Sequence, residues 1–381
     1  MDATDVNKSQ QERGYAVNFS ASLARFVAGL FIVVSAQVAS AAPEVLIAFG
    51  DSLSDRKNLL IDSAAQTGGQ LVAPPPTRYL DGRFSNGPIW LELLADSLGQ
   101  GTELRASREI PQAQIQSALL DGDVSVSYAY GGSVTGEGSS TTPDGLFEVP
   151  GLRQQVSDFT VDLDGARAPA GALFSLWAGS NDYLFALEAG TDPVAFVGEV
   201  VSNIGTSVNA LYDVGARKFL LPNLSRIGDV PLVSAFEQLQ GLPSGSLSDQ
   251  LNQLTLAHNA LLDATVDQLR ASLPGVEIVE LDVFALGEQA GGMLPLLPGP
   301  ASGCLFANVG IGNPATCAEF VDPATPAGFF WDELHPSAVV HQILAAAAIQ
   351  AVPVPAVIWL MVGGFVGLLS LRRRRARMVW S

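Results

Sequence analysis

Short apolar runs recur along the middle of the chain, separated by longer stretches in which apolar residues have the spacing of a helix. Each run is rich in β-branched or aromatic residues, as buried strands are; the runs cover residues 45–49, 124–130, 173–177, 218–221 and 276–281. Helical spacing is found in residues 89–98, 193–214 and 247–273, and Ser246 or Ser248 is the expected N-cap of the last stretch. Strands that alternate with helices predict an α/β fold with a parallel sheet of five strands, covered on both faces.

Stretches rich in glycine, proline and serine predict where the surface loops lie. They cover residues 68–76, 136–142 and 291–325. Neither an internal repeat nor a shift in composition divides the middle of the chain. We therefore expect one domain over residues 43–351, with residues 1–42 and 352–381 outside it.

The composition agrees with a globular domain and excludes wholesale disorder, because 48% of the 381 residues are hydrophobic. Charged side chains are sparse and unbalanced: 20 lysines and arginines against 38 aspartates and glutamates give a formal net charge of −18. The acidic excess is concentrated in residues 43–351, which carry about −23. Since binding to a phosphate backbone requires a basic face, nucleic acid is not an expected partner.

The N-terminal segment has the pattern of a secretory signal peptide. Arg25 precedes an apolar stretch over residues 26–38, and the small residues 39–41 follow it. Cleavage after Ala41 or Ala42 would release an exported protein. The polar lead over residues 1–23 is long for a signal, so an uncleaved anchor and a later translation start are the alternatives.

The C-terminal segment has the length and charge pattern of a membrane span. Residues 352–371 contain no charge and are long enough to cross a bilayer, and the arginines 372–375 follow them. The Val-Pro-Val-Pro sequence at residues 352–355 resembles the PEP-CTERM sorting signals of Gram-negative bacteria, which a sorting transpeptidase in the membrane reads and removes. The resemblance implies membrane contact through residues 352–371 before processing, and a body that ends in the periplasm, at the outer surface or outside the cell. A plain membrane anchor is the alternative, and it also places the body outside the cytoplasm.

Cys304 and Cys317 are the two cysteines of the chain, and a short loop separates them. In an oxidising compartment a disulfide that closes this loop would stabilise the fold by roughly 3 kcal/mol, so we expect a disulfide between them. Two cysteines and three scattered histidines do not predict a zinc site.

Small and polar residues follow the first three predicted strands. Residues 50–55 read Gly-Asp-Ser-Leu-Ser-Asp, residues 131–133 read Gly-Gly-Ser, and residues 179–182 read Gly-Ser-Asn-Asp. In open parallel sheets, ligands bind at the carboxyl ends of the strands. We therefore expect Ser52, the glycine pair and Asn181 to meet at one crevice.

A serine is a nucleophile at neutral pH only when a base takes its proton and a third group orients that base. His258 and His341 have apolar neighbours at helical spacing, and we expect both to be buried helix residues. His335 precedes a proline, which disfavours helix at the histidine, and it follows Asp332 by three residues. Asp332 can therefore reach one imidazole nitrogen and leave the other for the serine, with Glu333 as the weaker alternative.

Attack on an ester places negative charge on the carbonyl oxygen, and each donor aimed at that oxygen can contribute roughly 3 kcal/mol. The backbone N–H groups of Ser52 and Gly132 and the side-chain amide of Asn181 are the candidate donors. Taken singly, the last two residues are explained as readily by an ordinary turn glycine and a capping asparagine.

Four segments, in the same order along the chain, resemble the sequence blocks of the GDSL (SGNH-hydrolase) lipases and esterases. They are residues 49–55 for the first block, 128–132 for the second, 179–182 for the third and 332–336 for the fifth. Weaker matches extend the resemblance and cover residues 82–88 with Trp90, 150–156, 221–224 and 258–259.

The resemblance implies a three-layer α/β/α sandwich of flavodoxin-like topology that needs no metal and no cofactor. It implies that Ser52 is the nucleophile, that Asp332 and His335 are its partners, and that Ser52, Gly132 and Asn181 form the oxyanion hole. One segment departs from the family pattern. Relatives often have Ser-Asp-Thr-Gly-Asn where residues 54–58 read Ser-Asp-Arg-Lys-Asn, so we expect the local turn and the substrate entrance to differ.

Together these expectations describe an exported serine hydrolase that cleaves carboxylic esters, of small molecules or lipids, through an acyl-enzyme. Two alternatives are an O-acetyl esterase that acts on extracellular polysaccharide and a non-catalytic surface module. The module is the weaker alternative, because every triad and oxyanion residue of the family pattern has a match. Loop residues that could line an apolar acyl pocket, although core packing explains them equally well, are Leu146, Phe147, Phe329, Phe330 and Trp331.

Overall fold

A computed structural model of the chain describes residues 45–70, 72–98, 103–140, 148–303, 321–322 and 324–352. The predicted signal peptide, the tail from residue 353 onward and both cysteines lie outside these residues, and so do Leu146 and Phe147. The predictions made for those segments stay predictions. The described residues belong to a single compact unit, Ala42–Val354.

The centre of this unit is a parallel sheet of six strands in the order β2-β3-β1-β6-β7-β8. The strands are β1 (Leu46–Gly50), β2 (Leu104–Ala106), β3 (Ser125–Ser127), β6 (Leu173–Trp177), β7 (Lys218–Pro222) and β8 (Glu277–Leu281). In the register of the sheet, Ala48 of β1 lies between Ser127 of β3 and Ser175 of β6. Because all six strands are parallel, their carboxyl ends lie along one edge of the sheet.

The predicted α/β fold with a covered parallel sheet is confirmed, but the sheet has six strands instead of five. The missing strand, β2, has three residues and lies at the edge of the sheet, so it has no hydrophobic pattern that would reveal it. The stretch 136–142 was expected to be a loop throughout, and this is wrong in part. It contains β4 (Gly138–Ser140), which pairs antiparallel with β5 (Glu148–Pro150).

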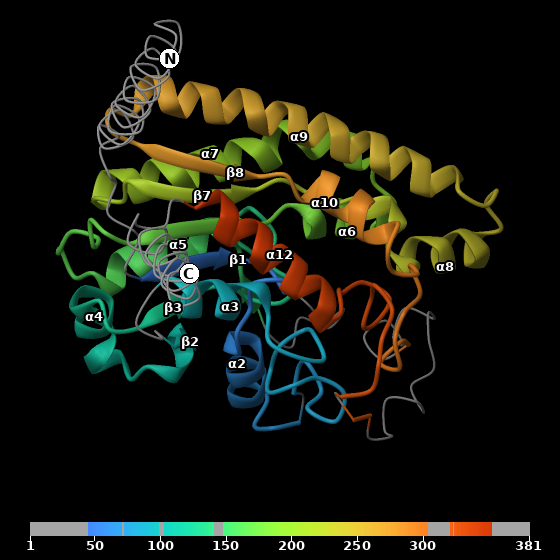
Figure 1. Ribbon diagram of the computed structural model, residues 1–381, viewed down its shortest axis with the longest axis horizontal. Coiled ribbons are helices and arrows are strands. Elements are labelled where there is room, and N and C mark those ends of the chain that lie inside the picture. Colours follow the sequence, from blue (N-terminus) through green and yellow to red (C-terminus); the bar gives the residue numbers. More distant parts are fainter. Residues whose placement is uncertain are drawn as a thin grey trace, which may run out of the picture. The chain divides into compact units, whose positions relative to one another are not determined.

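Helices cover both faces of the sheet (Figure 1). Alternate residues of β1 point to opposite faces, so Ile47 and Phe49 join one hydrophobic cluster while Leu46 and Ala48 join the other. The first cluster is completed by α4 (Gln112–Asp121), α5 (Leu152–Asp162), α7 (Val197–Val214) and the C-terminal half of α9 (Ser246–Ser272). The second contains α3 (Trp90–Ser97) and α12 (Ala338–Ala351), which crosses the strands at the front in Figure 1.

The remaining helices of the described residues lie in the connections between the strands or follow the last strand. They are α2 (Asn58–Gln66), α6 (Ser180–Glu188), α8 (Pro231–Gln240), α10 (Val283–Gly291) and the short 3₁₀ helices Ser107–Glu109, Pro193–Phe196 and Ile227–Asp229. The three predicted helical stretches correspond to α3, to a 3₁₀ turn followed by α7, and to α9.

The prediction that Ser246 or Ser248 is the N-cap of α9 was wrong. The N-cap position is Gly245, and the carboxylate of Glu237 accepts the backbone N–H groups of Gly245, Leu247 and Ser248 instead.

Among the described residues, Pro193–Val214 is the one helical stretch long and apolar enough to cross a bilayer. Its buried side chains, which include Val201, Ile204, Val208 and Leu211, pack against the sheet and the neighbouring helices. In this unit the stretch is therefore a core helix.

Candidate active site

The turn after β1 presents Ser52 at the carboxyl edge of the sheet. Gly50 ends the strand at φ 144°, and a Cβ atom there would collide with the carbonyl oxygen of Trp177 on the adjacent strand, so only glycine fits. The side-chain amide of Gln155 accepts from the N–H of Gly50 and donates to its carbonyl oxygen. Asp51 then closes the turn, because its Oδ1 accepts the N–H of Leu53 and its carbonyl oxygen accepts the N–H of Ser54.

His335 and Asp332 reach this serine from a turn near the C-terminal end of the domain. The N–H groups of Leu334 and His335 donate to Asp332 Oδ1, which folds the turn, and the N–H of Trp331 donates to the carbonyl oxygen of His335. His335 Nδ1 lies 2.8 Å from Asp332 Oδ2, and His335 Nε2 lies 2.8 Å from Ser52 Oγ. The structure thus joins the three predicted side chains in one chain of hydrogen bonds, although Ser52 and His335 are 283 positions apart.

The alternatives to these partners lie elsewhere. Glu333 accepts a hydrogen bond from the hydroxyl of Ser302. His258 is buried in α9 with its Nδ1 2.7 Å from the hydroxyl of Tyr183, and His341 is buried in α12, where its Nδ1 accepts the N–H of Trp90. Burial lowers the pKa of His258 to about 4 and that of His341 to about 3, so both are neutral at pH 7. The expectation that both are buried helix residues is confirmed.

Gly132 and Asn181, the predicted oxyanion residues outside the nucleophile turn, follow the strands next to β1. Gly132 follows β3 and has φ 80°, in a turn whose first glycine, Gly131, donates its N–H to Asp55 Oδ2. Asn181 lies in the first turn of α6, directly after β6, and its side-chain amide donates to the carbonyl oxygen of Ser133 at 2.9 Å. Ser52, Gly132 and Asn181 therefore come from the ends of three adjacent strands.

Burial and hydrogen bonding set the protonation of the carboxyl groups around Ser52. Burial alone would raise the pKa of Asp332, but the attraction of His335 and the hydrogen bonds from His335 and Tyr79 lower it below its usual value. For Asp51 burial prevails and raises the pKa to about 7, although the N–H of Leu53 and the charge of His335 act in the opposite direction. Asp332 is therefore the carboxylate that stays charged beside His335.

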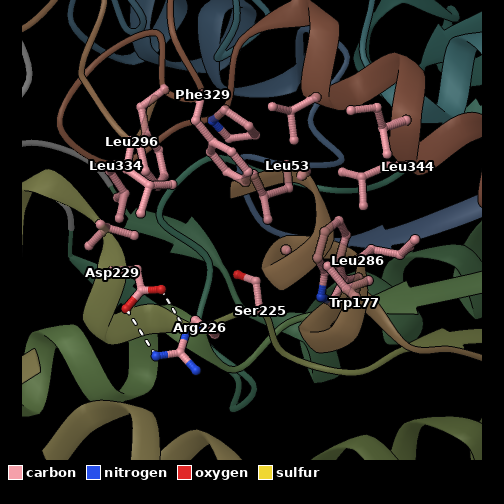
Figure 2. Close-up of a pocket in the computed structure, with 18 residues that line it drawn as sticks. Leu53, Trp177, Ser225, Arg226, Asp229, Leu286, Leu296, Phe329, Leu334 and Leu344 are labelled. Carbon is pink, nitrogen blue, oxygen red and sulfur yellow. Dashed lines mark hydrogen bonds and ion pairs between the residues drawn. The ribbon is translucent and has the colours of Figure 1, made fainter. Parts of the chain in front are cut away.

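An apolar chamber of about 80 Å³ is lined by residues that stand next to the serine and the histidine in the chain (Figure 2). Leu53 follows Ser52 in the chain, Leu334 and Pro336 flank His335, and all three line the chamber. Further walls come from α10, α12 and the segment 225–230, where Arg226 forms an ion pair with Asp229.

Two of the three described aromatic residues predicted for an acyl pocket line this chamber. Phe329 and Phe330 contribute to its wall. Trp331 packs in the core beside Tyr79 and Ala301, and its indole N–H donates to the carbonyl oxygen of Arg78. Core packing is thus the explanation for Trp331.

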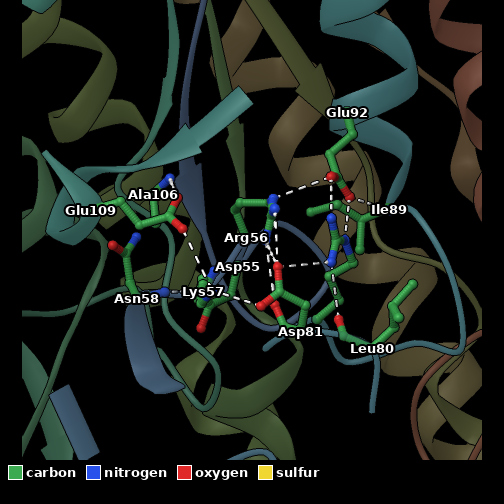
Figure 3. A network of polar contacts seen from close by, with 11 residues as sticks. Asp55, Arg56, Lys57, Asn58, Leu80, Asp81, Ile89, Glu92, Ala106 and Glu109 are labelled. Carbon is green, nitrogen blue, oxygen red and sulfur yellow. Dashed lines mark hydrogen bonds and ion pairs between the residues drawn. The ribbon is translucent and has the colours of Figure 1, made fainter. Parts of the chain in front are cut away.

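The cations that depart from the family pattern, Arg56 and Lys57, lie in an ionic network (Figure 3). Arg56 is 8% exposed and pairs with Asp81 and Glu92, while Lys57 pairs with Asp81 at 2.6 Å and with Glu109. Lys57 has φ 179°, which is extended backbone that any residue adopts, so this turn does not require glycine. Neither cation lines the apolar chamber.

Sequence reasoning missed two side chains that touch the histidine–aspartate pair. The hydroxyl of Tyr79 donates to Asp332 Oδ2 at 2.6 Å, and the ring of Phe84 lies 4.8 Å from that of His335 between centroids. Phe84 belongs to residues 82–88, which match the family weakly, and this match was the only indication in the sequence that the segment contributes to the site. Nothing local in the sequence indicates that Tyr79 contacts a residue 253 positions away.

A parallel sheet with a serine, a histidine and an aspartate joined at its carboxyl edge is the arrangement of a hydrolase, and comparison with known proteins identifies the family. The family model described as GDSL-like Lipase/Acylhydrolase matches residues 46–348, so the chain belongs to this family. It is accordingly a hydrolase of the esterase/lipase type.

Curated relatives match most of the length of this chain. One GDSL esterase/lipase of Arabidopsis thaliana is 28% identical over 361 residues, which covers 84% of this chain and 90% of that protein. A second one is 30% identical over 282 residues, covering 66% and 72%. Similar solved structures include a lipolytic protein of the G-D-S-L family from Veillonella parvula, at 12% identity and a TM-score of 0.37, covering 80% of this chain and 96% of that one. The acetylxylan esterase Axe2 from Geobacillus stearothermophilus has 12% identity and a TM-score of 0.39, covering 83% and 96%.

Proposed function

We propose that this protein is an exported serine hydrolase that cleaves carboxylic esters through an acyl-enzyme on Ser52. The observation that carries the proposal is the pair of 2.8 Å contacts that His335 makes, from Nε2 to Ser52 Oγ and from Nδ1 to Asp332 Oδ2. A nucleophile, a base and a group that orients the base are the three parts that acyl transfer needs.

In the proposed reaction, Ser52 Oγ attacks the ester carbonyl carbon while its proton moves to His335 Nε2. Asp332 stabilises the imidazolium, and the histidine then gives the proton to the departing alcohol as the ester bond breaks. Water then attacks the acyl carbon while His335 takes a proton from it, and the histidine returns this proton to Ser52 Oγ as the ester bond to the serine breaks and the acid leaves. Since the base must be neutral, activity falls as the pH is lowered into the range where the imidazole is protonated.

The oxyanion donors in this proposal are the N–H groups of Ser52 and Gly132 and the side-chain amide of Asn181. Gly131, the neighbouring glycine, donates its N–H to Asp55 Oδ2. The hydrogen bond from the Asn181 amide to the carbonyl oxygen of Ser133 fixes the position of this side chain. A donor held in place is the kind of group that stabilises a developing oxyanion, and this supports the proposed role of Asn181.

The apolar chamber favours an ester with a short acyl chain. A single water needs roughly 10–15 Å³ on the same scale, so a chamber of about 80 Å³ accepts a chain of several carbons. Leu53, Leu334 and Phe329 line it with apolar side chains, which make no hydrogen bonds to an acyl group. The proposal includes export because of the sequence patterns at the two ends of the chain.

Hydrolysis of p-nitrophenyl esters from acetyl to palmitoyl by the purified full chain, with Ser52→Ala as the matched variant, tests this function. We expect activity with an optimum at short to medium chains, and a loss of at least 10³-fold in the variant, roughly as for other triad serines. An optimum at acetyl with a steep fall beyond it would favour the O-acetyl esterase. Equal rates for a folded wild type and a folded Ser52→Ala would favour the non-catalytic module.

A further inference from the structure

The segment from Arg78 to Ser85 brings two aromatic side chains to the His335–Asp332 pair. Tyr79 is 1% exposed, and its hydroxyl donates to Asp332 Oδ2 at 2.6 Å. The ring of Phe84 covers the imidazole of His335 at 4.8 Å between centroids, tilted by 41°. The rings of Tyr79 and Phe84 also contact each other, at 6.0 Å, so the two side chains form one wall beside the histidine.

The hydrogen bond from Tyr79 completes the coordination of Asp332. Asp332 Oδ1 accepts the backbone N–H groups of Leu334 and His335, and Oδ2 accepts from His335 Nδ1 and from Tyr79. The carboxylate is fully buried, so these four bonds replace its hydration. Tyr79 and His335 therefore share one oxygen, and a change in either bond alters the other.

Ion pairs hold this segment against the turn that carries the nucleophile (Figure 3). Asp81 accepts from Lys57 at 2.6 Å and from Arg56 at 3.3 Å. Arg83 donates to both oxygens of Glu92, at 2.6 and 2.7 Å, and Arg56 lies 3.1 Å from the same carboxylate. Arg56 is largely buried and directly follows the block that contains Ser52, so the position of Tyr79 is tied to that of the serine.

We propose that Tyr79 is a positioning residue for the reaction at Ser52, and that Arg56 and Lys57 hold the segment that carries it. The inference rests on the proposed serine mechanism. The hydroxyl of Tyr79 fixes the plane of the Asp332 carboxylate and draws negative charge away from the bond to His335. The base is thereby held in one orientation while its attraction for a proton is moderated.

Several titratable groups interact electrostatically with His335, and the test must separate Tyr79 from them. Asp332 and Glu333 lie on the same turn, Asp51 lies on the nucleophile turn, and His341 lies on α12. The hydroxyl of Tyr79 bonds to Asp332, so Tyr79→Phe changes that carboxylate and leaves the side chains of the other three in place.

The kinetic test compares Tyr79→Phe with Tyr128→Phe in the full chain. Tyr128 is a matched control, because its hydroxyl donates to the carboxylate of Asp162 at 2.7 Å, away from the triad. Without the hydroxyl of residue 79, Asp332 Oδ2 is more basic and stabilises the imidazolium more strongly. We expect the midpoint of the acidic limb of the kcat/KM profile to rise by about 0.5–1 pH unit, and kcat to fall about three- to tenfold, in Tyr79→Phe alone.

A second variant tests the ionic network without touching Tyr79. Asp81 has φ 48°, which asparagine tolerates, so Asp81→Asn keeps the backbone and removes the charge that pairs with Arg56 and Lys57. We expect a rise of the acidic midpoint in the same direction but smaller. A wild-type profile for Asp81→Asn beside a shifted Tyr79→Phe would overturn the role of the network and keep that of Tyr79.

A spectroscopic measurement keeps this inference distinct from the proposed function. The ring N–H proton of His335, observed by NMR in ¹⁵N-histidine-labelled protein, should change its position and its pH midpoint in Tyr79→Phe and stay unchanged in Tyr128→Phe. An unchanged resonance together with an unchanged pH profile in Tyr79→Phe would overturn the inference. Absence of ester hydrolysis in the wild type would instead contradict the proposed function, and the resonance would still decide whether Tyr79 acts on the pair.

Discussion

Asp51, directly before the nucleophile, lies buried with its carboxyl group in a weakly compensated site. The N–H of Leu53 donates to it, whereas Asp332 accepts four hydrogen bonds. Burial raises the pKa of Asp51 to about 7, whereas the attraction of His335 and the hydrogen bonds from His335 and Tyr79 lower the pKa of Asp332. Two buried aspartates near one histidine thus have pKa values that are shifted in opposite directions.

The raised pKa of Asp51 predicts a pH-dependent contribution to stability. Between its ordinary value of 3.8 and about 7, the folded state holds a proton that the unfolded state has lost, so the contribution of Asp51 to the free energy of unfolding falls as pH rises through this window. Asp51→Asn keeps an acceptor for Leu53 and removes the charge. We expect the variant to gain roughly 1–3 kcal/mol relative to wild type between pH 5 and pH 8, measured by urea unfolding.

The control for this prediction is Asp121→Asn, at an exposed position. Its difference from wild type should be flat over the same pH range. Burial also raises the pKa values of Asp55 and Asp182. Both residues are present in the wild type and in each variant, so their pH-dependent contributions cancel in the difference. A difference between Asp51→Asn and wild type that does not vary with pH would contradict the account of Asp51.

At the residue scale, the sequence indicated which side chains meet but not what supports them. Ser52, Asp332 and His335 are brought together as expected, because each stands in a local pattern with its own chemistry. Their catalytic roles stay predictions. Tyr79 and the pairing of Arg56 with Asp81 and Glu92 depend on contacts between distant segments, which local patterns do not encode.

Helix α9, the longest in the described part of the chain, shows the same limit at the scale of an element. Hydrophobic spacing predicted the extent of α9 to within one residue at each end, since its buried positions recur along the whole length. Its cap was not predictable from nearby serines, because the acceptor is Glu237 at the end of the preceding helix. The edge strand β2 was missed for a different reason: three residues are too few for a pattern.

We predict that Glu237→Gln destabilises the start of α9. The amide nitrogen that replaces one carboxylate oxygen cannot accept an N–H, so at least one of the three bonds is lost, and we expect Tm to fall by about 2–5 °C by differential scanning calorimetry. The hydrogen bonds from Gly245, Ser248 and Leu247 lower the pKa of Glu237. The stability that the charged carboxylate contributes is therefore fully present above the ordinary glutamate pKa, and it is lost as the pH falls through the lowered pKa. Ser248→Ala is the control; a larger effect there would restore the serine as the cap.

The size of the chamber between α10 and α12 should limit the length of the acyl chain that the protein accepts. Leu286 on α10 lines it and is partly exposed, so a larger side chain can occupy the space without displacing the core. We expect Leu286→Trp to move the optimum of the p-nitrophenyl ester series toward acetyl and to lower kcat/KM for longer esters about tenfold or more. Leu239→Trp, at an exposed leucine on α8, should leave the series unchanged. An unaltered optimum in Leu286→Trp would place the acyl group elsewhere.

For the whole molecule, the parallel sheet explains how distant segments build one site. Ser52, Gly132 and Asn181 follow three adjacent strands, and His335 arrives on the turn that precedes α12. Alternation of strands and helices was sufficient to predict this edge, since parallel strands place their carboxyl ends together. The predicted signal peptide, sorting signal and disulfide lie outside the described residues, so export rests on composition and motif alone.

The most direct test of the central claim is covalent labelling of the full chain with a fluorophosphonate, followed by peptide mass spectrometry. The account predicts a single stoichiometric adduct on the peptide that contains Ser52, no adduct in Ser52→Ala, and labelling at least 100-fold slower in His335→Ala, roughly as loss of a general base requires. A folded wild-type protein that does not react, or an adduct on a different serine, would contradict the claim that Ser52 is the nucleophile.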